Sequence, residues 1–152
     1  MISSHSWGDT GSQQRIQALG GIIGPITHEA NGFVADWREI RAGRNSDFFF
    51  GVGFGSDING LHSQPRPRSN AAANPVRYPF LSFDQKSVID RQRSGTRVYD
   101  INTDGVDHYG LYPDWIEDLR RVGGRAIVED MANGAEAYLQ LWERAEAAAA
   151  TD

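Results

Sequence analysis

The stretch IIGPITH, residues 22–28, decides the fold class. A short apolar run with a proline near its end is typical of a buried strand whose terminus carries polar residues into a loop. A similar pattern opens the chain, where MISSHSW (1–7) predicts the last residues of a strand followed by a loop with a histidine. A third run, FFFGVGFGSD (48–57), predicts a buried strand that ends in a carboxylate.

Helices are predicted between these strands, over Gly11–Leu19 and Val34–Arg41, because apolar residues recur there at helical spacing. Strands that alternate with helices imply a parallel sheet or an α/β barrel. In both architectures the carboxyl ends of the strands gather at one face, where ligands bind. We therefore expect His5, His28 and Asp57 to lie close together at that face. A single histidine is, however, more often a loop residue whose hydrogen bonds are satisfied locally.

Residues 62–108 interrupt this alternation and are at first rich in proline, asparagine and arginine. Two short strands, Tyr78–Phe83 and Arg97–Ile101, flank a turn near Ser94–Gly95. The pattern predicts a long loop with a β-hairpin, inserted over the active face. Loops of that length are usually lids or binding loops.

The end of the chain predicts helices. The first starts at Pro113 and stops at Gly123–Gly124, the second covers Ala126–Met131, and the third begins at Asn133. Acidic residues near the start of the first helix suit its dipole, namely Asp114, Glu117 and Asp118. The predicted buried stripes of the first and third helices are Trp115, Ile116, Leu119 and Val122, and Tyr138, Leu141, Trp142 and Ala145.

Composition excludes several classes of protein. The 152 residues contain no cysteine, so a disulfide scaffold, an iron–sulfur cluster and cysteine-ligated zinc are excluded. The net charge of −5 lacks the basic footprint of a nucleic-acid partner. No apolar run approaches the roughly 20 residues of a membrane span, and the start lacks a signal-peptide layout. A cytoplasmic protein without a membrane partner is expected.

Two motifs that suggest ligand binding also have simpler structural explanations. DINTDG, residues 100–105, matches the first half of a calcium loop, but position twelve is Leu111 instead of glutamate, which favours a polar turn. The glycines between Gly51 and Gly60 do not form a nucleotide-binding G-x-G-x-x-G, and no G-x-S-x-G of a serine hydrolase occurs. Metal-assisted hydrolysis remains, with imidazole and carboxylate as ligands.

The order of SHS (4–6), the strand at 20–24 and GSDING (55–60) resembles the C-terminal half of the membrane (renal) dipeptidase family. The segment from Tyr112 to Leu119, the Gly123–Gly124 break and the Asn-Gly-Ala junction that follows resemble the closing helices of that family. The resemblance covers residues 2–61 and 110–145. It implies an α/β fold, the C-terminal part of a (β/α)8 TIM barrel with about three parallel strands, and a two-zinc site.

Carried over residue by residue, the resemblance implies that His5 is a zinc ligand and that Asp57 is catalytic, near the hydrolytic water. Arg15 resembles the arginine that binds the substrate carboxylate, although it lies one residue nearer the histidine than in the family. Asn59 replaces the second aspartate of the family motif and is a substrate-binding candidate. The substrate is expected to be a small peptide or related amide.

The early H-x-D ligand pair, the bridging glutamate and the first zinc histidine of the family have no counterpart in this sequence. We therefore expect one partial barrel domain over residues 1–152, with the insertion at about 62–108, which lacks its N-terminal half and is inactive alone. A homodimer partner is a further expectation. The alternatives are another amidohydrolase-like barrel, and a non-catalytic calcium- or carbohydrate-binding module. The aromatic residues of that module are Tyr78, Phe80, Phe83, Tyr99 and Tyr109.

Overall fold

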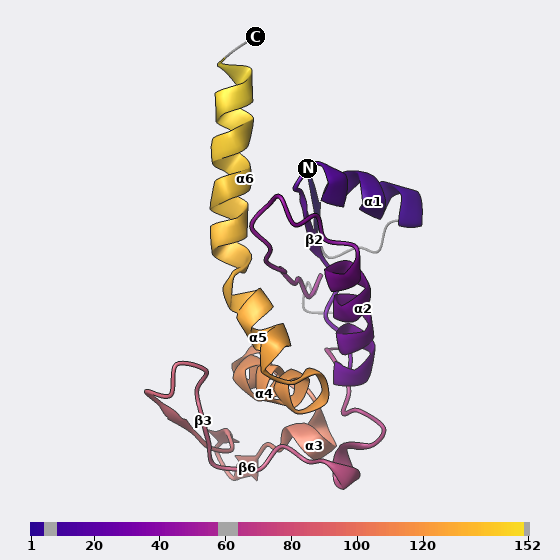
Figure 1. Ribbon diagram of the computed structural model, residues 1–152. Coiled ribbons are helices and arrows are strands. Elements are labelled where there is room, and N and C mark those ends of the chain that lie inside the picture. Colours follow the sequence, from indigo (N-terminus) through magenta and orange to yellow (C-terminus); the bar gives the residue numbers. More distant parts are fainter. Residues whose placement is uncertain (5–8, 58–63, 151–152) are drawn as a thin grey trace. The chain divides into compact units, whose positions relative to one another are not determined.

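The computed structural model describes residues 1–4, 9–57 and 64–150. It combines helices with short strands, so the chain is a mixed α/β protein (Figure 1). None of the described helices is long and apolar enough to cross a membrane. The chain divides into two compact units. Unit 1 comprises Met1–Ile26, Ala35–Asp57 and Glu129–Asp152, and unit 2 comprises Thr27–Val34 and Ile58–Val128.

Unit 1 contains a parallel sheet. β1 (Ile2–Ser4) pairs with β2 (Ile22–Gly24) in parallel, as predicted. Beyond β2, Ile26 forms a parallel bridge with Gly55, whose backbone N–H donates to the Pro25 carbonyl oxygen at 3.3 Å. Three successive segments therefore run in one direction. The described residues contain no closed barrel, and the (β/α)8 architecture stays a prediction.

The first connecting helix, α1 (Thr10–Ala18), confirms the helix predicted between the first two strands. Its N-terminus is capped by Asp9, whose carboxylate accepts hydrogen bonds from the Ser12 backbone N–H at 3.0 Å and from the Ser12 hydroxyl at 2.7 Å. The predicted glycine stop is also confirmed. Gly20 has a φ of +63°, a left-handed conformation that glycine adopts at helix ends without a steric penalty.

The second connecting helix, α2 (Ala30–Ala42), begins four residues earlier than the predicted start at Val34. The carboxylate of Glu29 accepts hydrogen bonds from the backbone N–H groups of Asn31 at 3.0 Å and Gly32 at 2.8 Å. These bonds satisfy two donors of the first turn, which extends the helix upstream. Its buried residues recur at helical spacing: Ala30, Phe33, Val34, Trp37 and Ile40.

The buried strand expected over residues 48–57 is wrong for most of that segment. Of these residues, all of them described, only Gly55 takes part in β pairing. The Val52 N–H donates instead to the Asp130 carbonyl oxygen at 2.9 Å. A Cβ added to Gly51 would lie 2.5 Å from the Asn133 carbonyl oxygen. Glycine permits this close backbone approach, so the segment hydrogen-bonds near residues 130–134 rather than in the sheet.

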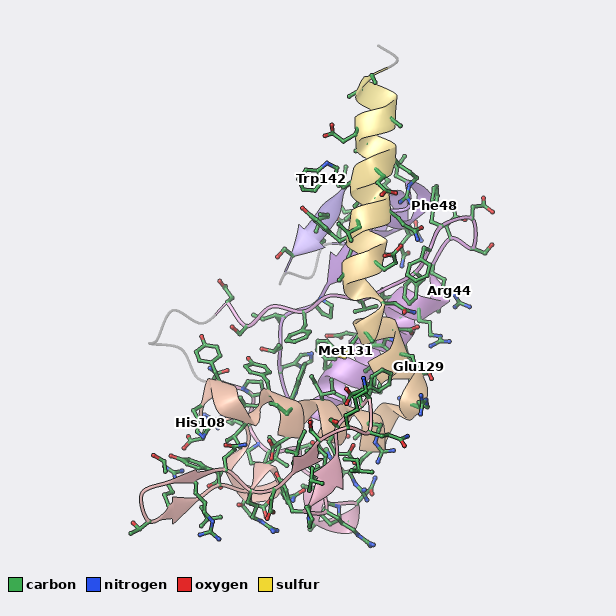
Figure 2. The ribbon with its side chains drawn as sticks, turned by 90° about the vertical axis from the view of Figure 1, so that its left-hand side faces the viewer. Arg44, Phe48, His108, Glu129, Met131 and Trp142 are labelled. Atoms are coloured by element: carbon green, nitrogen blue, oxygen red, sulfur yellow. The ribbon has the colours of Figure 1, made fainter. Side chains whose placement is uncertain are left out.

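The last helix, α6 (Gly134–Ala149), belongs to unit 1, and its Arg144 contacts the segment of residues 48–57. The Arg144 guanidinium lies 4.7 Å from the centre of the Phe48 ring, close enough for a cation–π contact. The burial expected for Tyr138 and Trp142 is wrong, because they are 42% and 54% exposed. In Figure 2, Phe48 and Trp142 lie on different sides of α6. The apolar stripe of α6 is thus only partly covered by the described residues.

Unit 2 is built around α4 (Tyr112–Gly123), which begins with Pro113 in its first turn and confirms the predicted helix. It is preceded by α3 (Ile101–Asp104) and η2 (Tyr109–Leu111) and followed by α5 (Arg125–Ala132), whose end belongs to unit 1. The buried apolar residues of this unit are Ala30, Phe33, Val34, Ala71, Val76, Ile101, Val106, Leu111, Trp115, Leu119, Ile127 and Val128.

The predicted insertion contains two small hairpins and a short helix, η1 (Ala71–Ala73). The expected pairing of Tyr78–Phe83 with Arg97–Ile101 is wrong, because each strand finds a partner nearer in the sequence. The turn predicted near Ser94–Gly95 is confirmed, and Gly95 has a φ of +60° there. The antiparallel pairs are β3 (Phe80–Leu81) with β4 (Val88–Ile89), and β5 (Arg93–Ser94) with β6 (Arg97–Val98).

Candidate functional site

The carboxyl ends of the parallel segments of unit 1 form the candidate site. β1 ends at Ser4 and β2 ends at Gly24, while the bridge at Gly55 is followed after one residue by Asp57. Because the three segments are parallel, their carboxyl ends face the same edge, the edge that binds ligands in α/β proteins. The sequence that follows β1 starts with His5, which lies outside the described residues.

Asp57 has an unusual backbone conformation at this edge. Its φ of +48° lies in the left-handed region, which aspartate tolerates better than most residues because its short side chain can form local hydrogen bonds. The side chain is exposed. The turn therefore presents a carboxylate to solvent two residues after the Ile26–Gly55 bridge, and the catalytic role of Asp57 stays a prediction.

The structure gives less information about the roles of the other predicted site residues. Arg15 lies in α1, the helix between β1 and β2, and its side chain is exposed. Asn59, like His5, lies outside the described residues. Of these predicted residues, the structure thus locates Asp57 at the strand-end edge and Arg15 on the neighbouring helix.

His28 contributes to the packing of unit 2. Its ring meets Phe33 edge-on, with 6.2 Å between ring centres. Its carbonyl oxygen accepts a hydrogen bond from the Trp115 indole N–H at 3.0 Å. These contacts support the alternative interpretation of this histidine as a residue satisfied by its local surroundings.

A zinc site is not assembled by the described residues. Within residues 1–4, 9–57 and 64–150, no group of three or more histidine, aspartate or glutamate side chains could hold a metal ion. Catalytic zinc takes about three protein ligands. The part of the chain that the structure describes therefore does not fit a zinc site by itself, and the predicted ligand His5 falls outside it.

The DINTDG motif forms a helix cap. The Asp100 carboxylate accepts a hydrogen bond from the Asn102 backbone N–H at 3.0 Å, and the Asp104 carboxylate accepts one from the Asp100 N–H at 2.8 Å. Asp100 is also ion-paired with Arg91 at 2.8 Å. The carboxylates thus serve the start of α3, which supports a polar turn over a calcium loop.

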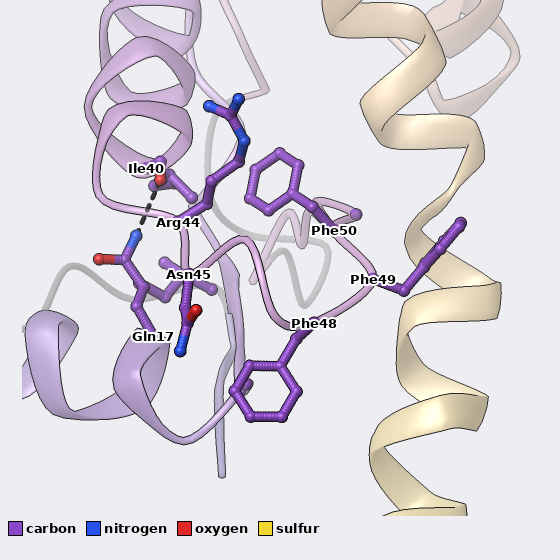
Figure 3. Close-up of a pocket in the computed structure, with 11 residues that line it drawn as sticks. Gln17, Ile40, Arg44, Asn45, Phe48, Phe49 and Phe50 are labelled. Carbon is purple, nitrogen blue, oxygen red and sulfur yellow. Dashed lines mark hydrogen bonds between the residues drawn. The ribbon is translucent and has the colours of Figure 1, made fainter.

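A small cavity in unit 1 lies between α1, the end of α2 and the loop of residues 45–51 (Figure 3). The Gln17 side-chain amide donates to the Ile40 carbonyl oxygen at 2.8 Å across one wall. The volume is about 20 Å³, room for about one water molecule. This cavity is a detail of packing and is too small for a substrate.

Unit 2 buries an ion pair. The Arg68 Nε lies 2.7 Å from Asp118 Oδ1, and the two side chains are 1% and 8% exposed. Arg68 also donates to the Asn70 carbonyl oxygen at 3.3 Å and to the Asn74 carbonyl oxygen. Burial raises the pKa of Asp118, and the hydrogen bond from Arg68 opposes that rise. This guanidinium therefore ties residues 68–74 to α4.

A second buried carboxyl group belongs to Asp114, which is fully buried. The Tyr78 hydroxyl donates to Asp114 Oδ1 and accepts a hydrogen bond from the Ile101 backbone N–H at 3.3 Å. Asp114 Oδ2 accepts no hydrogen bond from the described residues. Burial is the main cause that raises the pKa of Asp114, and burial together with this carboxylate raises the pKa of Tyr78.

The raised pKa of Asp114 predicts a pH-dependent stability. Because the folded-state pKa lies above the unfolded value of about 3.9, this group stabilises the fold fully only below that value, and the contribution is lost as the pH rises through the folded pKa. Asp114→Asn removes this titration. We expect the unfolding free energy of the variant, relative to the unchanged chain, to improve from about pH 4 to about pH 7 in urea denaturation.

Asp84→Asn is the control with the opposite sign. The Ser82 hydroxyl is the main cause that lowers the pKa of Asp84, so this group contributes stability that is lost as the pH falls through its folded pKa. The unfolding free energy of the Asp84 variant, relative to that of the unchanged chain, should therefore fall as the pH rises through the folded-state pKa of Asp84 toward the ordinary value of an aspartate. A constant difference between the Asp114 variant and the unchanged chain at every pH would contradict the prediction.

The burial of the acidic residues of α4 is not predicted in the sequence analysis. Asp114, Glu117 and Asp118 were interpreted as charges that favour the helix start, but α4 buries all three. A signal was available, because Asp114 and Asp118 are four residues apart and so share a helix face next to the apolar Trp115 and Leu119. Each acid is buried with its own partner: Asp118 with Arg68, Asp114 with the Tyr78 hydroxyl and Glu117 with Arg120.

No protein-family model, curated protein or solved structure matches this chain. The candidate site therefore depends on the geometry of the described residues. In unit 1 that geometry is a set of parallel strand ends with an exposed carboxylate at Asp57.

Proposed function

We propose that this chain is the C-terminal portion of a dipeptidase-like metallohydrolase that cleaves a peptide or related amide bond with an activated water. The observation that carries the proposal is the parallel bridge between Ile26 and Gly55. It adds the segment that ends in Asp57 to the edge at which β1 and β2 end. Polar residues at successive strand ends, with helices between the strands, match the plan of a barrel hydrolase.

Asp57 is the proposed general base. An exposed carboxylate can take a proton from water as the water oxygen attacks the amide carbonyl carbon. The C–N bond then breaks, and the same proton passes to the leaving amine. The left-handed turn at Asp57 fixes where this carboxylate leaves the strand end.

The remaining roles complete the proposal. Arg15, exposed on α1, would bind the substrate carboxylate through its guanidinium, and Asn59 would contact the substrate next to Asp57. Zinc would supply Lewis-acid polarisation of the carbonyl. It would need His5 together with ligands beyond the described residues, so we expect the 152-residue chain alone to be inactive.

The first test uses the purified chain. Dipeptide hydrolysis and zinc content are measured together, and the expected result is negligible hydrolysis with less than one zinc per chain. Stoichiometric zinc with hydrolysis would contradict the proposed inactivity. The second test reads the DNA upstream of Met1. An in-frame H-x-D and glutamate are expected, and their absence would refute the proposal.

Asp57→Asn in the protein encoded by the complete reading frame tests the proposed base. We expect hydrolysis to fall about a hundredfold or more, because general-base catalysis contributes about 10²–10⁴-fold. Asp47→Asn is the matched control, since Asp47 is also exposed and belongs to the same unit but follows no strand end. Equal activity of the Asp57 variant and the unchanged enzyme would remove Asp57 from the mechanism.

A further inference from the structure

The last helix of unit 1, α6, has an apolar face that the described residues leave open to solvent. Tyr138, Leu139 and Trp142 are 42%, 54% and 54% exposed. Trp142 lies on a different side of α6 from Phe48, whose ring contacts the helix (Figure 2). Contiguous apolar surface of this kind typically marks an interaction site. This face is termed the exposed stripe, and its residues are Ala135, Tyr138, Leu139, Trp142, Ala145 and Ala149.

The spacing of the exposed stripe is that of a coiled-coil seam. Ala135, Tyr138, Trp142, Ala145 and Ala149 follow one another at intervals of three and four positions alternately. Such an alternation places an apolar side chain every 3.5 residues on average, the pattern by which one helix packs along another. The occupant that fits this face is therefore a second amphipathic helix.

A hollow beside Tyr138 adds a place for an anchoring side chain. It has a volume of about 190 Å³, and Ile2, Ile22, Gly24 and Tyr138 are among the residues of unit 1 that line it. A few large side chains that fill such hollows carry most of the binding energy of a protein interface. Because the exposed stripe and the hollow share Tyr138, one partner helix can contact both.

The charged side chains beside the exposed stripe are acidic. On a helix with 3.6 residues per turn, Glu136, Glu143 and Glu146 lie on the same flank of the stripe. Glu146 is also in the last turn of α6, where the helix dipole is negative and where α6 has no basic residue. A cationic group on this flank is therefore attracted by the carboxylates and by the end of the helix.

The one basic residue of α6 serves a different contact. Arg144 donates a hydrogen bond to the Gly20 carbonyl oxygen at 2.9 Å, and its guanidinium lies over the Phe48 ring. A second copy of α6 would bring the same three carboxylates to the interface without another basic residue to oppose them. Charge complementarity therefore favours a basic partner over a second copy of this chain.

We propose that the exposed stripe binds a basic amphipathic helix of a partner protein. The apolar side of that helix packs on Tyr138 and Trp142, and its lysine or arginine side chains face Glu143 and Glu146. Binding at this surface needs no catalytic residue, so the proposal goes beyond the hydrolase function proposed above.

Isothermal titration calorimetry of the full chain with three synthetic helical peptides tests the proposal. The peptides share a leucine seam and carry lysine, glutamine or glutamate at the flanking positions. We expect the lysine peptide to bind about tenfold more tightly than the glutamine peptide, and the glutamate peptide to bind weakest. Added salt should remove most of the difference between the lysine and glutamine peptides, because Glu143 and Glu146 are exposed.

Two variants assign the binding to the exposed stripe. Glu143→Gln with Glu146→Gln should weaken binding of the lysine peptide about tenfold and leave binding of the glutamine peptide unchanged. Trp142→Ala should weaken binding of both peptides by at least about tenfold, because an aromatic anchor is lost. Glu39→Gln with Asp47→Asn is the matched control, since both are exposed acids of unit 1 outside α6, and it should bind the lysine peptide as the unchanged chain does.

Analytical ultracentrifugation of the unchanged chain and of Trp142→Ala tests a second copy as the occupant. We expect the substitution to leave the oligomeric state as it is, and a dimer that Trp142→Ala dissociates would overturn the proposal. The proposal is also overturned if no peptide binds, or if the three peptides bind equally. Unchanged affinity of the Glu143 and Glu146 double variant for the lysine peptide, with unaltered circular dichroism, would overturn it as well.

Discussion

Arg68→Met is expected to lower the free energy of unfolding of unit 2 by about 3–5 kcal/mol, the usual effect of removing one partner of a buried ion pair. The substitution leaves Asp118 buried without the guanidinium 2.7 Å away. It also removes the hydrogen bonds that Arg68 donates to the carbonyl oxygens of Asn70 and Asn74. Hydrogen exchange of peptides from residues 64–128 measures the loss within unit 2.

Two further variants separate the ion pair from a general defect in folding. Replacing both partners, as Arg68→Met with Asp118→Leu, should recover much of the lost stability, because neither charge of this pair is then left buried without its partner. Arg93→Met, at an exposed arginine of the same unit, should change stability by less than about 0.5 kcal/mol. A cost for Arg68→Met below about 1 kcal/mol would equal that of a surface pair and contradict the prediction.

Trp115→Ala is expected to destabilise unit 2 by about 3–5 kcal/mol, the range for deleting a large buried aromatic side chain. Trp115 is 2% exposed. Its ring centre lies 4.9 Å from that of Phe33 and 5.7 Å from that of Tyr112, both in edge-on arrangements. Its indole N–H donates to the His28 carbonyl oxygen at 3.0 Å. Urea denaturation followed by far-ultraviolet circular dichroism measures the change.

Trp115→Phe and Trp142→Ala are the matched comparisons. The phenylalanine variant keeps an aromatic ring but leaves the His28 carbonyl without its donor, so a smaller cost of about 1–3 kcal/mol is expected. Trp142 is 54% exposed, and its removal should cost less than about 0.5 kcal/mol. If Trp142→Ala destabilises the chain more than Trp115→Ala, the burial of the two residues has been assigned in the wrong order.

Local patterns predicted the elements whose stabilising contacts are close in sequence. The capped helix α1, its stop at Gly20 and the helix that starts at Pro113 all follow from residues within a few positions of each end. The parallel pairing of β1 with β2 followed from the alternation of strands and helices.

The failures involve partners that are distant in sequence. Residues 48–57 have the apolar character of a strand, but the Val52 N–H bonds to Asp130, which no local pattern indicates. The local sequence predicts Asp118 only as a charge that favours the helix dipole, because its partner, Arg68, lies 50 residues away. The structure places Asp57 after the parallel bridge at Gly55, while its catalytic role stays a prediction and the described residues contain no ligand set for zinc.

The close approach of residues 51–52 to residues 133–134 has an evolutionary consequence. A Cβ at Gly51 would lie 2.5 Å from the Asn133 carbonyl oxygen, and one at Gly134 would lie 2.8 Å from the Val52 carbonyl oxygen. Neither backbone atom can yield as a flexible side chain would. A substitution at either position is therefore not expected to be neutral. Descendants of this chain should keep both glycines, or replace them only where the backbone of these segments has also changed.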